Sequence, residues 1–127
     1  MARNFKVYKC PVCGNIVTLL HEGGGELVCC GQPMKLLKAG EIDTAAKEKH
    51  VPVVTVSETT VSVKVGEVTH PMTAEHLIEW IALVTDTEVF LKYLTPADEP
   101  KADFQVSVSD GTFDVYEYCN LHGLWRA

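Results

Sequence analysis

The spacing of the cysteines constrains this chain more than any other feature. Four of the five lie between positions 10 and 30, as Cys10-Pro-Val-Cys13-Gly and Cys29-Cys30-Gly. A C-x-x-C loop directs two thiolates to one metal ion, and Gly14 can take the turn conformation that points backbone amides toward both sulfurs. A second pair completes a tetrahedral four-sulfur site, which zinc and iron both accept. We therefore expect a turn-rich ribbon held by a metal, with zinc and iron both open.

The adjacency of Cys29 and Cys30 is unusual for two ligands of one ion. Neighbouring Cα atoms lie only ~3.8 Å apart, and successive side chains of an extended strand point in opposite directions. We expect the four-sulfur site to be distorted from a regular tetrahedron for this reason. A disulfide framework is not expected, because the odd number of cysteines leaves one unpaired and reducing compartments keep thiols free.

Length and charge limit the possible functions. A chain of 127 residues can bury one ordinary core and a minidomain that needs a metal. With 17 acidic and 11 basic side chains the net charge is −6, so nucleic acid is not an expected partner.

The longest apolar run, residues 77–84, is shorter than the ~20 residues that cross a bilayer. The start of the chain has no apolar segment typical of a secretion signal, so we expect a cytoplasmic protein without a membrane span.

After Val51 the sequence alternates between apolar and polar residues and is rich in Val and Thr, a pattern typical of short antiparallel strands. The pattern predicts an all-β fold, with a small metal ribbon at residues 1–38, a linker with one helical turn at 39–49, and an antiparallel β-sandwich or barrel at 50–127. Three consecutive glycines at positions 23–25 predict a hairpin tip within the ribbon. The predicted strands of the second domain are residues 53–56, 60–65, 77–84, 88–94, 104–108 and 112–118.

The second domain carries a second group of candidate metal ligands. Cys119-Asn-Leu-His122 is a C-x-x-H loop that directly follows a predicted strand, and His70 and His76 flank a turn that begins with proline. His50 directly follows the linker. Such positions at the ends of strands are where a rigid scaffold presents functional side chains. We therefore expect these five side chains to meet, and we leave His21 out because it lies in the glycine-rich ribbon.

Three metals compete for this second site. A copper electron-transfer site needs a methionine after the C-x-x-H segment, and only Leu124 to Ala127 follow Gly123. Met72 lies upstream and is expected to pack rather than to bind. A structural zinc site would close its shell with four ligands and leave one of the five candidates unexplained. Five ligands suit an octahedral iron with one open position.

An iron ion with an open position can transfer one electron to a small anionic oxidant such as superoxide, and a thiolate ligand increases its electron density. The product, hydrogen peroxide, needs two protons. Lys49 precedes His50 and is a candidate to attract the anion and to support its protonation. Glu48 is a candidate ligand of the oxidised metal, and an ordinary surface role for both residues remains open.

Taken together, these motifs resemble the desulfoferrodoxin family, the two-iron class of superoxide reductases. The resemblance rests on Cys10-Pro-Val-Cys-Gly, Cys29-Cys-Gly, Glu48-Lys-His-Val-Pro, His70-Pro-Met and Cys119-Asn-Leu-His-Gly-Leu-Trp. It implies a desulforedoxin-like domain followed by an immunoglobulin-like β-sandwich. It also implies two iron ions, one bound by Cys10, Cys13, Cys29 and Cys30, the other bound by His50, His70, His76, Cys119 and His122, with Glu48 and Lys49 beside the open position.

The resemblance further implies a homodimer that takes electrons from a rubredoxin-type donor, with a first iron centre that is structural or relays electrons. Two other functions stay open at this point. One is a rubredoxin-like electron-transfer protein, in which the histidine cluster would be incidental. The other is a zinc-stabilised interaction module, which would be colourless.

Overall fold

The computed structural model describes residues 2–40, 47–109 and 111–127, and it describes residues 47 and 48 by their backbone only. The chain forms two compact units, Asn4–Lys38 and the rest of the described chain. The backbone N–H of Arg3 donates to the carbonyl of Thr85 at 3.1 Å, so the start of the chain belongs to the second unit. Residues 41–46 of the expected linker lie outside the described residues.

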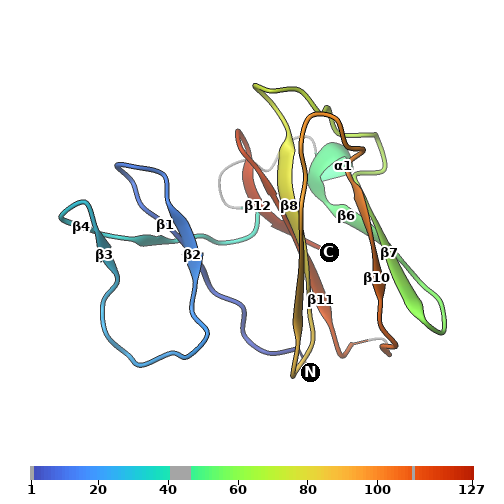
Figure 1. Ribbon diagram of the computed structural model, residues 1–127, viewed down its shortest axis with the longest axis horizontal. Coiled ribbons are helices and arrows are strands. Elements are labelled where there is room, and N and C mark those ends of the chain that lie inside the picture. The colour runs from blue at the N-terminus through green and yellow to red at the C-terminus, as the bar shows by residue number, and fades with distance from the viewer. Residues whose placement is uncertain (1, 41–46, 110) are drawn as a thin grey trace. The chain divides into compact units, whose positions relative to one another are not determined.

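The first unit consists of short strands (Figure 1) and contains little apolar core. Its strands are β1 (Val7–Lys9), β2 (Ile16–Thr18), β3 (Val28–Cys29), β4 (Gln32–Pro33) and β5 (Lys35–Leu36). β1 pairs with β2 and β5, and β3 pairs with β4, all antiparallel. Its buried apolar side chains are Val7, Cys10 and Leu37. So small a core does not hold a domain of this size by burial alone, which agrees with the predicted metal ribbon.

The predicted hairpin at the three glycines is wrong. Residues 23–25 lie between β2 and β3, and these two strands pair with other partners rather than with each other. The glycine run is therefore a loop that connects two separate sheets. Consecutive glycines permit a tight turn, but the pairing partners depend on contacts far away in the sequence.

The second unit is the predicted β-sandwich, with one sheet in the order β10-β7-β6 and the other in the order β12-β11-β8-β9. Figure 1 shows β6, β7 and β10 on one side and β8, β11 and β12 on the other. This arrangement of seven antiparallel strands is that of an immunoglobulin-like sandwich. The elements are α1 (Lys47–His50), β6 (Pro52–Val56), β7 (Thr60–Val65), β8 (Ile78–Val84), β9 (Val89–Tyr93), β10 (Lys101–Gln105), β11 (Asp114–Cys119) and β12 (Gly123–Arg126).

The core of the sandwich follows from the alternation of side chains along each strand. On β7, Val61, Val63 and Val65 are all buried, whereas Lys64 is exposed. Ala102 and Phe104 of β10 face the same core. Since side chains of a strand alternate between its two faces, every second residue of these strands enters the space between the sheets.

Two strands of the sandwich differ most from the sequence prediction; the segment 60–65 matches β7, and the other predicted strands shift by one or two residues at their ends. β10 begins at Lys101 and ends at Gln105, so the strand lies three residues earlier than the predicted segment 104–108. The strand β12 was not predicted, and its backbone pairs with β11 from Gly123 to Arg126. No helix in the described part of the chain has the length and apolar character that crossing a bilayer requires.

The strand register brings the predicted ligands to one end of the sandwich. The start of β6 pairs with the end of β7, at Pro52 and Val65. The end of β11 pairs with the start of β8 and with the start of β12, since Cys119 lies opposite both Ile78 and Gly123. In Figure 1, α1 and the loop that leads into β8 lie at the upper end of the sandwich. All five predicted ligands of the second site belong to this end.

Candidate metal centres

The four cysteines of the first unit meet in one cluster, with sulfur atoms that all lie within 4.8 Å of one another. The loop after β1 has the predicted conformation. Gly14 has φ +81°, and the backbone N–H groups of Val12 and Cys13 both point at the sulfur of Cys10, at 3.4 Å each. The N–H of Asn15 lies 3.5 Å from the sulfur of Cys13. These donors stabilise thiolates, which is the form that binds a metal.

The adjacent pair is accommodated by the backbone of Cys30. Among the described residues, Cys30 alone combines a side chain with a positive φ, +52°. This left-handed conformation interrupts the alternation of an extended strand, so the sulfurs of Cys29 and Cys30 lie 3.9 Å apart on the same side. The sulfurs of Cys13 and Cys29 are 3.6 Å apart. Both distances are close to the ~3.8 Å between two sulfurs that are bound tetrahedrally at ~2.3 Å. The predicted distortion of the sulfur–metal angles stays a prediction.

The thiols of this cluster have unequal proton affinities. Backbone N–H donors, that of Cys13 foremost, lower the pKa of Cys10 to about 6. Cys29 lies against the sulfurs of Cys10 and Cys13, and its pKa rises to about 12. Four sulfurs in contact cannot all ionise without a cation among them, because each thiolate repels the next. The cluster therefore has the donor set and the spacing of a metal site.

Four histidine rings form a closed circuit at the upper end of the sandwich, in which each ring contacts two of the others. The ring centroids of His50 and His70 are 4.9 Å apart, those of His70 and His76 are 4.6 Å apart, those of His76 and His122 are 5.2 Å apart, and those of His122 and His50 are 4.8 Å apart. The ligand atoms of His50, His70, His76 and Cys119 all lie within 4.8 Å of one another. The five side chains predicted to meet are therefore brought together, with His122 joined to the group through its two ring contacts.

His70 shows how a ring is held with one nitrogen directed into the cluster. Its Nδ1 lies 2.7 Å from the carbonyl of Pro71, and because a carbonyl only accepts, this nitrogen carries the proton. Nε2 of the ring is thus an unprotonated acceptor. It lies 3.2 Å from Nε2 of His50, close to the ~3.0 Å between two nitrogens bound at right angles to one ion at ~2.1 Å. A hydrogen bond from the outer ring nitrogen is the usual way to orient a metal-binding histidine.

Burial favours the neutral, metal-binding form of His70 and His76. Burial lowers the pKa of His70 to about 4. It also lowers the pKa of His76, and the charges of His122 and Lys49 lower it further. The Nε2 atom of His76 is buried and has no hydrogen-bond partner among the described residues. Because a buried polar atom without a partner costs about 1–3 kcal/mol, this orphaned nitrogen fits a position that a metal ion would satisfy.

Cys119 belongs to both the core and the histidine cluster. Its side chain is fully buried and packs within the apolar core of the sandwich. Burial raises the pKa of its thiol, and backbone N–H groups of Leu121 and His122 oppose the rise by hydrogen bonding to the sulfur. The β-ladder between β8 and β11 has an irregularity between Tyr118 and Cys119, next to the site. Such bulges commonly redirect a side chain at a functional position.

Sequence reasoning missed several residues that support the ligands. The ring of Trp125 stacks on His50, with centroids 4.8 Å apart and an interplanar angle of 12°. Its Nε1 donates to the carbonyl of His122 at 3.1 Å. Pro71 supplies the carbonyl that orients His70. In the sequence, only the closeness of Trp125 and Pro71 to a candidate ligand pointed to them. Their contacts with the histidines form only in the folded chain.

The other predicted residues have different positions. Met72 packs against the core, and its sulfur accepts the N–H of Ile78 at 3.4 Å, so its packing role agrees with the prediction. His21 is exposed in the loop after β2. Lys49 is exposed and close enough to lower the pKa of His76 through its charge. Glu48 belongs to α1, but its side chain lies outside the described residues.

The geometry and burial of the second cluster argue against an incidental role for the histidines. His50 and His70 are buried, and each makes ring contacts with two other histidines. The buried Nε2 of His76, which has no hydrogen-bond partner among the described residues, fits a ligand shared with the neighbouring rings. The alternative of a pure electron-transfer protein, in which this cluster has no function, is therefore not favoured.

Comparison with known proteins agrees with these two clusters. Residues 42–127 match the family model described as desulfoferrodoxin, and residues 2–37 match the model of the desulfoferrodoxin N-terminal domain. A desulfoferrodoxin of Syntrophotalea carbinolica is 52% identical over 127 residues, which cover 100% of this chain and 98% of the relative. A desulforedoxin of Megalodesulfovibrio gigas is 59% identical over 34 residues, 27% of this chain and 92% of the relative.

A solved structure extends the likeness to the whole fold. The superoxide reductase from Treponema pallidum superposes with a TM-score of 0.79 at 34% identity, and the match covers 100% of this chain and 99% of that one. The family models, the full-length relative and the two donor sets, four cysteines and a group of histidines with one cysteine, lead to one conclusion. The chain is a member of the desulfoferrodoxin family.

Proposed function

We propose that this protein is a superoxide reductase, which reduces superoxide to hydrogen peroxide with one electron from an external donor. The observation that carries the proposal is the circuit of four histidine rings with the sulfur of Cys119 beside it. Similarity to the superoxide reductase of Treponema pallidum over the full chain supports the same reaction. The overall step consumes one superoxide, one electron and two protons for each hydrogen peroxide.

The ligand set that we assign is His50, His70, His76, His122 and Cys119 for the reactive iron. The second set, Cys10, Cys13, Cys29 and Cys30, is assigned to the iron of the ribbon. Bound iron(II) at the histidine cluster would supply the one-electron chemistry. Neutral imidazoles would leave the ion its positive charge, which would favour an anionic substrate, and the buried thiolate of Cys119 would donate electron density to it.

Lys49 is proposed to attract superoxide and to support proton delivery. Its ammonium group is exposed, and its charge acts on His76, which places that charge near the cluster. In a chain with net charge −6, a local positive charge raises the rate of encounter with an anion. Glu48 is proposed as a ligand of the oxidised iron, on the basis of its position in the family motif.

The remaining parts of the proposal concern partners and location. A rubredoxin-type protein is proposed as electron donor, a homodimer as the assembly and the cytoplasm as the compartment, all on the basis of family membership. Residues 1–38 and 50–127 are proposed as the two domains, joined by 39–49; through its backbone hydrogen bond to Thr85, Arg3 is structurally part of the second. The ribbon iron is proposed to be structural, with electron relay as its second possible role.

The products of superoxide decay test the proposal. With a reductant present, a superoxide reductase forms one hydrogen peroxide for each superoxide and releases no oxygen. A dismutase forms one hydrogen peroxide and one oxygen for every two superoxide ions. We expect stoichiometric peroxide and consumption of the reductant, measured together with an oxygen electrode. Oxygen release at half the superoxide consumed would contradict the proposal.

A further inference from the structure

Asn120 lies between two of the assigned ligands in sequence and contacts the loop that carries a third. It follows Cys119 and precedes His122 by two residues. The regular ladder between β8 and β11 ends at Ile78 and Cys119. Beyond this pair, Asn120 forms two hydrogen bonds with Leu77. Its backbone N–H donates to the carbonyl of Leu77 at 3.2 Å, and its side-chain Oδ1 accepts the N–H of Leu77 at 3.0 Å.

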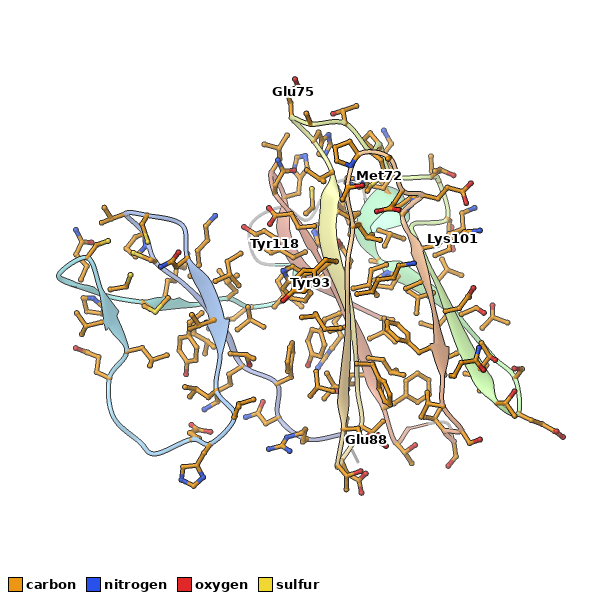
Figure 2. The ribbon with its side chains drawn as sticks, in the orientation of Figure 1. Met72, Glu75, Glu88, Tyr93, Lys101 and Tyr118 are labelled. Carbon is orange, nitrogen blue, oxygen red and sulfur yellow. The ribbon has the colours of Figure 1, made fainter. Side chains whose placement is uncertain are left out.

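The same side chain reaches the other neighbour of His76. Nδ2 of Asn120 donates to the carbonyl of Glu75 at 2.9 Å. Glu75 and Leu77 are the residues on either side of His76, so one side chain holds the backbone before and after this ligand. Figure 2 shows Glu75 at the outer tip of the loop that leads into β8, and Met72 nearer the sandwich.

The backbone of His76 itself is held by a different residue. The hydroxyl of Thr73 accepts the N–H of His76 at 3.0 Å, and the N–H of Thr73 donates to the carbonyl of His76 at 2.9 Å. These bonds close the turn locally, but they do not connect it to any other ligand. The connection to Cys119 and His122 is made by Asn120.

We propose that Asn120 is a positioning residue of the reactive centre, whose side chain joins the loop carrying His76 to the end of β11, which carries Cys119, and to the turn that carries His122. The inference rests on the proposed function, since it assumes that these side chains share one iron. Asparagine suits the role because a single short amide offers a donor and an acceptor together. Aspartate keeps the acceptor for Leu77 and loses the donor for Glu75, and alanine loses both.

The test is the rate at which each centre loses iron to an excess of chelator. We expect Asn120→Ala to lose iron from the histidine centre at least about tenfold faster than the wild type, since removing the partners that orient metal ligands costs about 10–100-fold in affinity. Its thiolate-to-iron absorption band should also shift. The iron of the four-cysteine centre serves as an internal reference and should be lost at an unchanged rate.

Two further variants separate positioning from general stability. Thr85→Ala is the matched control, because its hydroxyl also bonds backbone groups of a loop, the N–H groups of Thr87 and Glu88, but at the other end of β8. Figure 2 shows Glu88 at that far end, away from Glu75. We expect Thr85→Ala to lower the unfolding temperature without changing either iron-loss rate or the absorption band. Asn120→Asp should lie between Asn120→Ala and the wild type, and it decides the case if the alanine variant does not fold.

The outcomes distinguish this inference from the function on which it rests. If the wild type shows the band of the histidine centre and both Asn120 variants lose iron at the wild-type rate, the positioning role is wrong and the proposed function stands. If Thr85→Ala accelerates iron loss as much as Asn120→Ala, the effect is one of general stability and the inference is also wrong. If the wild type itself lacks that band and holds only the four-cysteine iron, the proposed function and this inference both fail.

Discussion

At the scale of single residues, Cys119 connects the fold to the proposed chemistry. Its sulfur lies with the ligand atoms of three histidines, and its side chain packs with buried aliphatic residues of both sheets. Backbone N–H groups of Leu121 and His122 bond to the sulfur and stabilise its thiolate form against the effect of burial. A small thiolate can therefore be both a core side chain and a metal ligand at this position.

Cys119→Ser tests the assignment of this ligand. Replacing the sulfur with oxygen removes the thiolate, so we expect the thiolate-to-iron charge-transfer band of the histidine centre to disappear from the visible spectrum. The bands of the four-cysteine centre should remain. The reciprocal variant Cys13→Ser should remove those bands and leave that of Cys119. Survival of the histidine-centre band in Cys119→Ser would refute the assignment.

Lys49→Ala tests electrostatic attraction of the substrate. Removing the charge should slow the second-order reaction with superoxide by roughly tenfold at low ionic strength and weaken its dependence on salt. Rapid mixing or pulsed generation of superoxide at several salt concentrations measures both effects. Lys92→Ala removes the same charge from an exposed position on β9 and should change neither. An unchanged salt profile in Lys49→Ala would argue against steering.

Gly66→Ala tests how the segment before His50 is held. Gly66 has φ +82°, and a Cβ there would lie 2.6 Å from the carbonyl carbon of Lys49 and 2.5 Å from the carbonyl oxygen of Val68. Gly111 has a similar φ of +78°, but a Cβ there would meet nothing within 4 Å. Gly111→Ala should cost about 1–2 kcal/mol from backbone strain alone.

Because the backbone must also move in Gly66→Ala, we expect that variant to lower the free energy of unfolding by roughly 2–4 kcal/mol. It should also weaken iron binding at the histidine centre, since Lys49 directly precedes His50. Denaturant unfolding of the two alanine variants measures the difference. If both alanine variants lower the free energy of unfolding equally, the close approach of the new Cβ to Lys49 does not destabilise the protein.

At the scale of elements, the two units are stabilised in different ways. The strands of the ribbon contain two or three residues each, and several of its apolar side chains, such as Val12, Leu20 and Val28, are exposed. The strands of the sandwich are longer and bury a continuous apolar core. We therefore expect the ribbon to need its metal to fold, as small metal domains generally do, and the sandwich to fold without that metal.

Amide hydrogen exchange on Cys13→Ser tests this difference. Loss of one sulfur should prevent stable metal binding, and the amides of β1, β2 and β5 should then exchange at rates close to those of an unfolded chain. The amides of β8 and β11, in the centre of the sandwich sheet, should keep wild-type protection. Retained protection in β1 would show that the ribbon folds without its metal.

The elements were predictable from the sequence where local patterns determine them. The predicted segment 60–65 has the same bounds as β7, because its alternating valines all face the core and its other residues do not. The boundaries of β10 were not predictable, since the pairing with β7 starts at Lys101, before the apolar segment that suggested a strand. The short strand β12 lacks a pattern of its own, because Leu124 and Trp125 are both buried and the strand exists through pairing with β11.

The members of the two clusters could be predicted for a chemical reason, and the residues that contact them could not. Cysteine and histidine are rare enough that their spacing indicates a metal site. Trp125 and Asn120 have ordinary side chains, and their roles arise from a stacking contact and three hydrogen bonds that form only in the folded chain. The conformation of Cys30 was likewise unforeseen, because an adjacent pair suggested strain at the metal rather than in the backbone.

At the scale of the whole molecule, each unit carries its own cluster of candidate metal ligands, and the two clusters differ in ligand chemistry. The ribbon offers four sulfurs, a closed set that suits a structural or electron-storing ion. The sandwich offers imidazoles and one thiolate at one end of a rigid scaffold, a set that suits reaction with a small anion. We therefore assign the reaction to the sandwich and a supporting role to the ribbon.

Anomalous diffraction at the iron absorption edge, from crystals of the iron-loaded protein, locates the metal ions in both units. We predict two iron peaks per chain, one among the four cysteines and one within bonding distance of ring nitrogens of His50, His70, His76 and His122 and the sulfur of Cys119. A single peak at the cysteines, or a second peak to which the Cys119 sulfur is not bonded, would contradict this prediction.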